Sequence, residues 1–149
     1  MMTVLPSAVL FCCTMNEVRS PMAEGIMKRF HGSRVFVDSA GVHQGSLDPL
    51  MVEVMAEIGV DMSHHKPKIF ENLADDSFDV VISLSPHAQH KAVDLTRYMS
   101  CDVRFWNIFD PTVVEGTREA RLAAYRQVRS QLQDKILDLF PRPHDDFYS

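Results

Sequence analysis

The sequence predicts a single-domain α/β fold, a three-layer sandwich in which helices flank a four-stranded parallel sheet. Three observations support this prediction. Short apolar runs alternate with longer amphipathic stretches along the chain. The first apolar run is continuous rather than alternating in polarity, as expected for a strand that is buried on both faces. The 149 residues are about the length of one domain and contain no internal repeat or linker, so we expect one domain over 1–149.

Four segments have the composition of strands. The first has the sequence AVLFC and contains no charged side chain. The other three contain the β-branched and aromatic residues that favour strands. The expected strands, in chain order, are 8–12, 35–39, 79–84 and 103–106.

Three of the expected helices begin with a capping residue followed by proline, which is pre-organised for the first helical position. These pairs are Ser20-Pro21, Asp48-Pro49 and Ser85-Pro86. The first helix should run to about Phe30. The second should end at Gly59, because glycine suits a left-handed C-terminal cap.

The last helix is expected over 117–140, because apolar side chains recur there at steps of three and four. This apolar stripe consists of Leu122, Tyr125, Val128, Leu132, Ile136 and Leu139. The two prolines within 141–149 indicate a loose tail. An acidic stretch indicates a solvated face and consists of Glu71, Asp75, Asp76 and Asp79.

Composition and charge exclude several classes of protein. Lys and Arg number 15 against 20 Asp and Glu, a net charge of -5, which argues against non-specific nucleic-acid binding. No apolar run approaches the roughly 20 residues that span a bilayer, and the start lacks the basic front end of a secretory signal. Three cysteines do not form a disulfide framework, so we expect a cytoplasmic protein with reduced thiols and no membrane partner.

The segment after the first strand has the chemistry of an oxyanion site. Cys13 ends the strand, and backbone N–H groups from Thr14 to Arg19 can surround a tetrahedral anion. The helix that begins near Pro21 and the Arg19 guanidinium add positive charge. Such surroundings favour the thiolate form of a cysteine, and a thiolate facing a phosphoryl group is a nucleophile. On its own, Cys13 would instead be read as a small buried hydrophobe.

The same stretch resembles the opening of the low-molecular-weight protein tyrosine phosphatases. The similarity covers residues 9–14, Asn16 and 19–24, and the thioredoxin-type arsenate reductases share this fold and loop. Later similar segments are Ser39-Ala40-Gly41, Gly59-Val60-Asp61-Met62-Ser63-His64 and Asp110-Pro111. The resemblance implies the low-molecular-weight phosphatase fold. It also implies a phosphatase that hydrolyses phosphomonoesters, above all protein phosphotyrosine.

The resemblance further implies a role for individual residues. Cys13 would carry a phosphocysteine intermediate, and Arg19 would stabilise the transition state. Asp110 would protonate the leaving oxygen and then activate water, although Asp before Pro is also a common turn starter. Asn16 would shape the loop and Ser20 would donate a hydrogen bond to the thiolate. The expected catalytic residues are Cys13, Arg19 and Asp110, and the expected substrate-binding residues are Thr14, Met15, Asn16, Glu17, Val18 and Ser20.

The loop departs from the family pattern at two positions. Met15 stands where the family usually has glycine, so its side chain would crowd the pocket mouth or require an unusual backbone angle. Val18 stands where many of these phosphatases carry a second cysteine that can trap an oxidised nucleophile as a disulfide. Cys12 is expected in the core, facing away from Cys13, because successive strand residues point to opposite faces.

The expected wall for a substrate ring also departs from the family. Aromatic residues often follow Asp-Pro in these phosphatases, whereas this chain has Thr112-Val113-Val114. Trp106 and Phe109 precede the aspartate instead. Candidates for a further wall are His43, Gln44 and Leu47.

Two other functions stay open. Arsenate resembles phosphate in shape, so the loop suits an arsenate reductase. Thioredoxin-coupled reductases carry a cysteine pair just after the third strand, but residues 83–90 contain no cysteine, and Cys101 is expected to be structural. An arsenate reductase built on this chain would therefore combine its single loop cysteine, Cys13, with an external thiol. The other function is a non-catalytic, phosphate-binding regulatory module, which the Met15 departure suggests.

No cofactor is expected, and no metal site. The pairs His64-His65 and His87 with His90 have ligand-like spacing, but no further residues complete a four-ligand set. The expected partners are phosphorylated proteins or small phosphomonoesters, and oxyanions such as phosphate.

Overall fold

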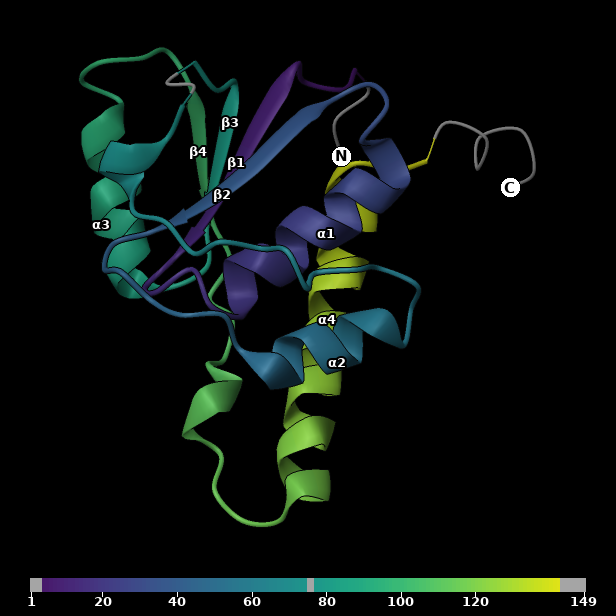
Figure 1. The fold of residues 1–149 in the computed structure, drawn as a ribbon. Helices are drawn as coiled ribbons and strands as arrows, with labels where there is room; N and C mark the ends of the chain where they lie inside the picture. Colours follow the sequence, from purple (N-terminus) through teal and green to yellow (C-terminus); the bar gives the residue numbers. More distant parts are fainter. Residues whose placement is uncertain (1–3, 75–76, 143–149) are drawn as a thin grey trace.

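A computed structural model describes residues 4–74 and 77–142. Four parallel strands form one sheet in the order β2-β1-β3-β4. The strands are β1 (Ala8–Cys13), β2 (Phe36–Gly41), β3 (Val80–Ser83) and β4 (Asp102–Phe105). The predicted α/β architecture is therefore confirmed (Figure 1). The bounds of all four strands differ from the sequence prediction by one or two residues at one or both ends.

The strand register places the end of β1 at the centre of one edge of the sheet. Cys12 pairs with Ala40 of β2 on one side and with Ser83 of β3 on the other. Cys13 is level with Gly41, the last residue of β2. Because the strands are parallel, their carboxyl ends share this edge, where open α/β sheets bind ligands.

The helices cover both faces of the sheet (Figure 1). They are α1 (Arg19–His31), α2 (Pro49–Ala56), α3 (Pro86–Leu95) and α4 (Arg118–Leu139), with short 3-10 turns η1 (Phe70–Asn72) and η2 (Pro111–Val113). One face carries α1 and α4, with α2 packed against α4, and the other carries α3. Two apolar clusters fill these two interfaces, one on each side of the sheet.

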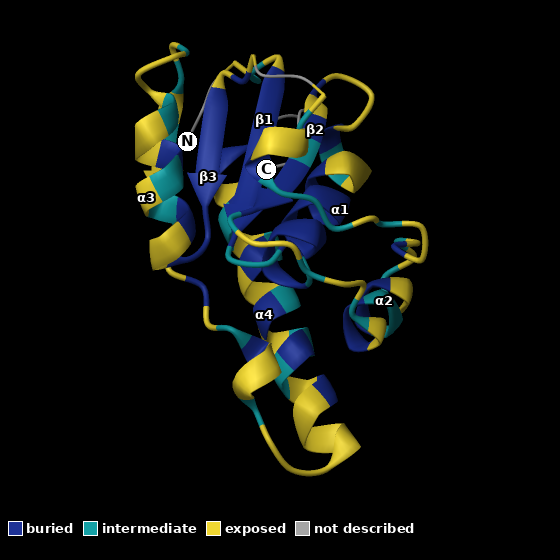
Figure 2. Cartoon of the chain, turned by 60° about the vertical axis from the view of Figure 1, so that its left-hand side comes forward, coloured by how far each residue is buried: buried dark blue, intermediate teal, exposed yellow. Residues whose placement is uncertain are grey.

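Burial follows the predicted pattern. Every residue of β1 and of β3 is buried, and Figure 2 shows these two strands in dark blue, whereas the edge strand β4 is largely exposed. The predicted apolar stripe of α4 is buried at all six positions, which are Leu122, Tyr125, Val128, Leu132, Ile136 and Leu139. No helix in the described ranges is long and apolar enough to cross a membrane.

Two of the three predicted caps, Asp48 and Ser85, are present, and Thr117 supplies a further cap that was not predicted. Asp48 accepts from the backbone N–H groups of Leu50 and Met51, Ser85 accepts from that of Ala88, and Thr117 accepts from that of Ala120. Helix α2 ends at Ala56, three residues before the predicted end, but Gly59 has a φ of +77°, as the predicted left-handed cap requires. The backbone N–H of Val60 closes this cap by donating to the carbonyl of Met55 at 3.0 Å.

The third predicted cap is wrong, because Ser20 does not cap α1. The helix begins one residue earlier, at Arg19, with Val18 in the capping position and no side-chain cap. The Ser20 hydroxyl is directed to the end of β1 instead, where it lies 2.9 Å from the sulfur of Cys13.

The predicted acidic face is only partly described. Glu71 is exposed and pairs with Lys91 at 2.8 Å, as expected of a solvated side chain. Asp79 is exposed as a residue, but its carboxylate also accepts from the backbone N–H groups of Ser7 and Ala8, both at 2.9 Å. It therefore helps to fix the start of β1. Asp75, Asp76 and most of the predicted tail, 143–149, lie outside the described residues.

Candidate active site

The site is built on Cys13, the last residue of β1. Its side chain is buried, with 2% of the residue exposed, and it belongs to the apolar cluster beneath α1 and α4. Residues 14–18 form a loop without regular structure and lead directly into α1. The positive end of α1 therefore lies at the loop, as anion binding favours.

Ser20 and Asn16 form a hydrogen-bonded chain behind the sulfur. The Asn16 side-chain amide donates to the hydroxyl of Ser20 at 2.8 Å and to that of Ser39 at 2.9 Å. Since the Ser20 oxygen accepts from Asn16, its own proton is available to the Cys13 sulfur 2.9 Å away. The chain of hydrogen bonds thus orients the Ser20 hydroxyl toward the sulfur.

Asn16 also has the one unusual backbone conformation among the described non-glycine residues, a φ of +56°. Asparagine tolerates this left-handed region better than most side chains do. Met15 does not adopt a positive φ, so the expectation that it would need an unusual backbone angle is wrong. The loop turns one residue later instead.

Glycines accommodate the backbone of Met15. A Cβ on Gly41 would lie 2.7 Å from the carbonyl carbon of Met15, and one on Gly45 would lie 2.4 Å from its carbonyl oxygen. Both contacts are too short for a real side chain, so these glycines permit the loop to pack against the segment after β2.

Arg19 and Asp110 face each other across the mouth of the site. Arg19 is largely buried, and its Nη1 donates to the carbonyl of Ile108 at 3.0 Å. Its Nη2 lies 3.9 Å from the Asp110 carboxylate, whose side chain is 39% exposed. Asp110 also accepts from the backbone N–H of Thr112 at 3.0 Å and from its hydroxyl at 2.7 Å. The carboxylate is therefore held in place but remains accessible to a ligand.

These side chains enclose a small pocket with a volume of about 40 Å³, suited to a group the size of a single oxyanion. It is lined by Cys13, Met15, Glu17, Val18, Arg19, Asp110 and Thr112. Within the described ranges, no other group of the chain accepts a hydrogen bond from the backbone N–H groups of 15–18. Those donors are thus available to a bound anion.

The predicted substrate-binding residues therefore divide into two sets. Met15, Glu17 and Val18 line the pocket. Asn16 and Ser20 lie behind it, in contact with each other and, through Ser20, with the sulfur. Two of the side chains have partners outside the pocket: the Thr14 hydroxyl donates to that of Ser85 at 3.0 Å, and the Glu17 carboxylate accepts from the backbone N–H of Ser46 at 2.8 Å.

The candidate substrate walls lie in different places. Trp106 is partly buried in the core, with its ring 6.3 Å from that of Phe11. Phe109 is 55% exposed, beside Asp110. Gln44 donates to the carbonyl of Pro67 at 3.0 Å, and the His43 ring packs edge-on against His87. Leu47 is exposed. None of these candidate wall residues lines the pocket; beside Asp110, only Thr112 does so.

The other two cysteines do not face the site. Cys12 belongs to the apolar cluster on the opposite side of the sheet, as predicted, and burial raises the pKa of its thiol well above the usual range. Cys101 precedes β4 and is level with the start of β1, about five residues or ~16 Å along the sheet from Cys13. Burial also raises the pKa of the Cys101 thiol. Neither thiol is placed to attack a group bound to Cys13.

The sequence did not predict which residues outside the loop contact Asn16. His65 Nε2 lies 3.0 Å from the Asn16 carbonyl, and the backbone N–H of Lys68 donates to the Asn16 side chain at 3.0 Å. Ser39 in turn donates to the Glu24 carboxylate. The segment 39–41 was identified as similar to the family, but no pattern in the sequence connects it with Glu24, His65 and Lys68.

No metal centre is present in the described ranges, where no group of three or more His, Cys, Asp or Glu side chains is placed to hold an ion. One member of each histidine pair singled out in the sequence makes a contact outside its pair. His65 contacts the loop through Asn16, and His87 contacts His43.

The first strand of this parallel sheet ends in a cysteine, and the loop that follows leads to an arginine at the start of a helix. These features define the class of cysteine-based oxyanion-binding α/β proteins. The chain belongs to the low molecular weight phosphotyrosine protein phosphatase family, whose description matches residues 8–144. The predicted family is therefore confirmed, and it is a family of enzymes.

Individual relatives carry two kinds of name. An arsenate reductase of Bacillus subtilis is 30% identical over 128 residues, which cover 86% of this chain and 91% of that protein. Solved structures described as an arsenate reductase in the oxidized and phosphate binding states match with TM-scores of 0.73 and 0.70 at 29% and 28% identity, covering 89% of this chain and 95% of theirs. The low molecular weight protein tyrosine phosphatase from T. tengcongensis matches at 0.69 and 26% identity, covering 88% and 97%. These names support the alternative of arsenate reduction better than the phosphatase prediction.

Proposed function

We propose that the protein hydrolyses phosphomonoesters through a phosphocysteine intermediate on Cys13. The observation that carries this proposal is the Asp110 carboxylate on the wall of the Cys13 pocket, 3.9 Å from Arg19. Ester hydrolysis needs a proton donor for the leaving oxygen, and Asp110 is positioned for that role. Ester hydrolysis does not need a second thiol, and neither Cys12 nor Cys101 lines the pocket.

In the first step, the Cys13 thiolate attacks phosphorus while the backbone N–H groups of the loop and Arg19 hold the phosphoryl oxygens. The sulfur–phosphorus bond forms, the phosphorus–oxygen ester bond breaks, and protonated Asp110 gives its proton to the leaving alcohol or phenol. The ionised Asp110 then remains at the pocket mouth.

In the second step, Asp110 takes a proton from water, whose oxygen attacks phosphorus. The phosphorus–sulfur bond breaks and releases inorganic phosphate and the Cys13 thiolate. The hydroxyl of Ser20, 2.9 Å from the sulfur, stabilises that thiolate as it departs.

Protein phosphotyrosine is the substrate that we propose. The pocket has room for little more than the phosphoryl group, so the aryl group of the substrate would lie at its mouth, near the lining residues Met15 and Thr112. Small aryl phosphates should react for the same reason. The three cysteines are free, which agrees with the reducing conditions of the cytoplasm, where we place the protein.

Arsenate reduction is the second candidate, favoured by the names of the relatives at 29–30% identity. The Cys13 sulfur would attack the arsenic of arsenate. Water or hydroxide would leave the arsenic, and a sulfur–arsenic adduct would form. An external thiol such as glutathione would then attack the Cys13 sulfur and release arsenite, so that As(V) is reduced and a mixed disulfide forms. A second thiol would restore Cys13 and leave an oxidised disulfide.

One experiment separates the candidates. Purified protein and the Cys13→Ser variant are assayed for hydrolysis of para-nitrophenyl phosphate and, in parallel, for arsenite formation from arsenate with glutathione and glutaredoxin. Hydrolysis that disappears in the variant supports the phosphatase. Arsenite formation without hydrolysis would replace it with the reductase. Phosphate binding with neither reaction would indicate a regulatory module.

A further inference from the structure

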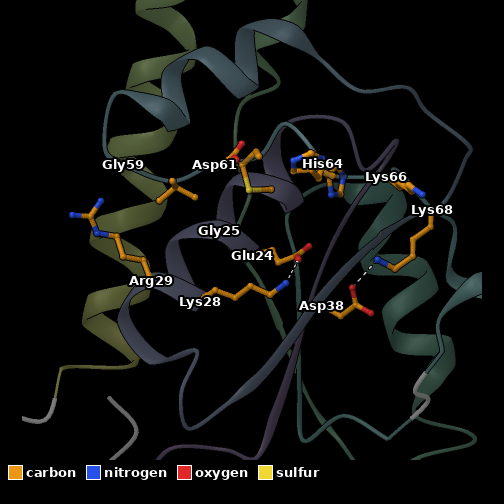
Figure 3. Close-up of a pocket in the computed structure, with 13 residues that line it drawn as sticks. Glu24, Gly25, Lys28, Arg29, Asp38, Gly59, Asp61, His64, Lys66 and Lys68 are labelled. Carbon is orange, nitrogen blue, oxygen red and sulfur yellow. Dashed lines mark hydrogen bonds and ion pairs between the residues drawn. The ribbon is translucent and has the colours of Figure 1, made fainter.

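A second and larger cavity lies behind the catalytic loop (Figure 3). Its volume is about 780 Å³, within the range of small-molecule sites. It is lined by Glu24, Gly25, Lys28, Arg29, Asp38, Gly59, Val60, Asp61, Met62, His64, His65, Lys66 and Lys68. No cysteine, serine or threonine lines it, so it offers no hydroxyl or thiol nucleophile.

The cavity is locally basic although the chain has a net charge of -5. Its lining has four lysine and arginine side chains and three carboxylates. Lys28 pairs with Glu24 at 2.5 Å and Lys68 pairs with Asp38 at 2.6 Å. Two of the three carboxylates are thereby neutralised within the wall.

The third carboxylate is also engaged, which leaves two cations without an anionic partner. Asp61 accepts from the backbone N–H and the hydroxyl of Ser63, and these hydrogen bonds lower the pKa of its carboxyl. In the described part of the chain, Arg29 and Lys66 form no ion pair or hydrogen bond through their side chains. Figure 3 shows Arg29 at one end of the cavity and Lys66 at the other.

The floor between these ends is small and apolar. A Cβ on Gly25 would lie 3.0 Å from side-chain atoms of Met55, Val60 and Met62, so glycine allows the segment after α2 to pack closely on α1. An organic skeleton can therefore lie against Val60 and Met62 while its charged ends reach Arg29 and Lys66.

We propose that this cavity binds a small organic molecule with two separated anionic groups, of the sugar bisphosphate type. The two unpaired cations at opposite ends of the cavity match two anionic groups better than one. The apolar floor favours an organic skeleton over a bare inorganic anion.

The wall of this cavity is connected to Cys13. His65 and Lys68 line the cavity and both contact Asn16, each at 3.0 Å. Asn16 in turn donates to Ser20, which lies 2.9 Å from the Cys13 sulfur. A ligand that draws Lys66 and its neighbours inward shifts the segment that holds Asn16, and therefore alters the reactivity of Cys13. This coupling rests on the proposed role of Cys13, whereas the binding itself does not.

Binding is tested by calorimetry on protein whose Cys13 has been carboxymethylated, which prevents turnover and blocks the catalytic pocket. Fructose 1,6-bisphosphate is the probe, and fructose 6-phosphate and inorganic phosphate are the comparison ligands. The bisphosphate should bind about tenfold more tightly than either comparison ligand. Equal affinity for all three, or no binding of the bisphosphate below about 1 mM, would overturn the proposal.

Variants locate the site. Arg29→Ala and Lys66→Ala should each weaken bisphosphate binding about fivefold or more, because each removes one charge-assisted contact. Arg34→Ala is the matched control, since Arg34 is exposed and does not line the cavity. Unchanged affinity in both Arg29→Ala and Lys66→Ala would show that the ligand binds elsewhere and would overturn the assignment.

The coupling is tested on unmodified protein by the rate at which iodoacetamide alkylates Cys13. The bisphosphate should change this rate in the wild-type protein and in Arg34→Ala but not in Lys66→Ala. An equal effect in all three proteins would mean direct occupation of the catalytic pocket and would overturn the coupling. Absence of phosphatase activity would leave the calorimetric result intact, so the two proposals fail separately.

Discussion

The hydroxyl of Ser20 lies 2.9 Å from the sulfur of Cys13, across the turn between β1 and α1. α1 lacks a side-chain cap because Val18 occupies the capping position, and the hydroxyl of Ser20, two residues further on, does not bond to the helix backbone. Here its oxygen accepts from the Asn16 amide, and its proton is left for the sulfur. The first turn of α1 thus directs a hydroxyl to the Cys13 sulfur and not to its own backbone.

The first prediction concerns that contact. Ser20→Ala should slow release of the Cys13 thiolate from the phosphocysteine about 10- to 160-fold, since a hydrogen bond to a charged group contributes about 1.5–3 kcal/mol. Rapid-mixing kinetics with para-nitrophenyl phosphate would show this as a larger burst followed by slower turnover. Ser33→Ala, at an exposed position, is the control. Equal slowing of burst and turnover would contradict the role in the second step.

Asp110 gives the second prediction. Asp110→Asn keeps an oxygen that can accept from Thr112, so the loop should stay folded, but it removes the proton donor. Hydrolysis of phenyl phosphate should fall about 100-fold or more. Hydrolysis of para-nitrophenyl phosphate should fall much less, because its leaving group needs less protonation. The measurement is kcat for both substrates, and an equal loss would argue against an acid at this position.

The sequence predicts those residues of the site that lie close together along the chain better than those that lie far apart. Cys13 and Arg19 lie within one strand–loop–helix segment, so local rules place them together. Asp110 was identified through the resemblance to a family, and the structure brings it to 3.9 Å from Arg19. Ser20 was assigned a cap by the same local rules, and this was wrong because a tertiary partner, the Cys13 sulfur, competes for its hydroxyl.

The support behind the loop could not be predicted in the same way. Ser39, His65 and Lys68 contact Asn16, and Glu24 joins them through Ser39, so that three separate parts of the chain meet behind the loop. Each residue alone has an ordinary interpretation as a surface or strand residue. Their convergence depends on the register of β2 beside β1 and on the path of the chain after α2, neither of which leaves a local signature.

The third prediction uses the ion pairs between the end of α2 and α4. Glu57 accepts from Arg126 and from Arg129, and these hydrogen bonds, with that of Arg126 the larger, lower the pKa of Glu57 to about 2. A lowered pKa in the folded state stabilises the protein above the ordinary pKa of the carboxyl, 4.5, and this contribution disappears as the pH falls through about 2.

Glu57→Gln should therefore lower the Tm at neutral pH, and this difference should shrink as the pH falls below 4.5 and disappear below about 2, where the wild-type carboxyl becomes protonated. Thermal unfolding of both proteins across this range tests the expectation, with Glu115→Gln as an exposed control. High salt should reduce the difference, because these groups are close to solvent. A difference in Tm that is independent of pH would show that the charge of Glu57 is not responsible.

The fourth prediction concerns His31 at the end of α1. Its Nε2 lies 2.7 Å from the carbonyl of Phe140, just past α4, and both residues are buried. His31→Ala should lower the free energy of unfolding by about 1–3 kcal/mol, because it leaves that carbonyl without a donor in the core. Urea unfolding monitored by circular dichroism measures the change. His90→Ala, at an exposed position, should have little effect, and equal losses in the two variants would contradict this account.

The last prediction separates the two ways in which Met15 could matter. Met15 lines the pocket, and its backbone packs against Gly41 and Gly45 without adopting a positive φ. Its effect on substrate choice should therefore come from its side chain and not from backbone strain. Met15→Ala removes the side chain and keeps backbone stiffness, whereas Met15→Gly removes both. If crowding is the cause, both variants should raise kcat/KM for naphthyl phosphate relative to para-nitrophenyl phosphate by a similar factor of about ten. A change confined to Met15→Gly would show instead that backbone freedom limits the loop, since only glycine supplies it.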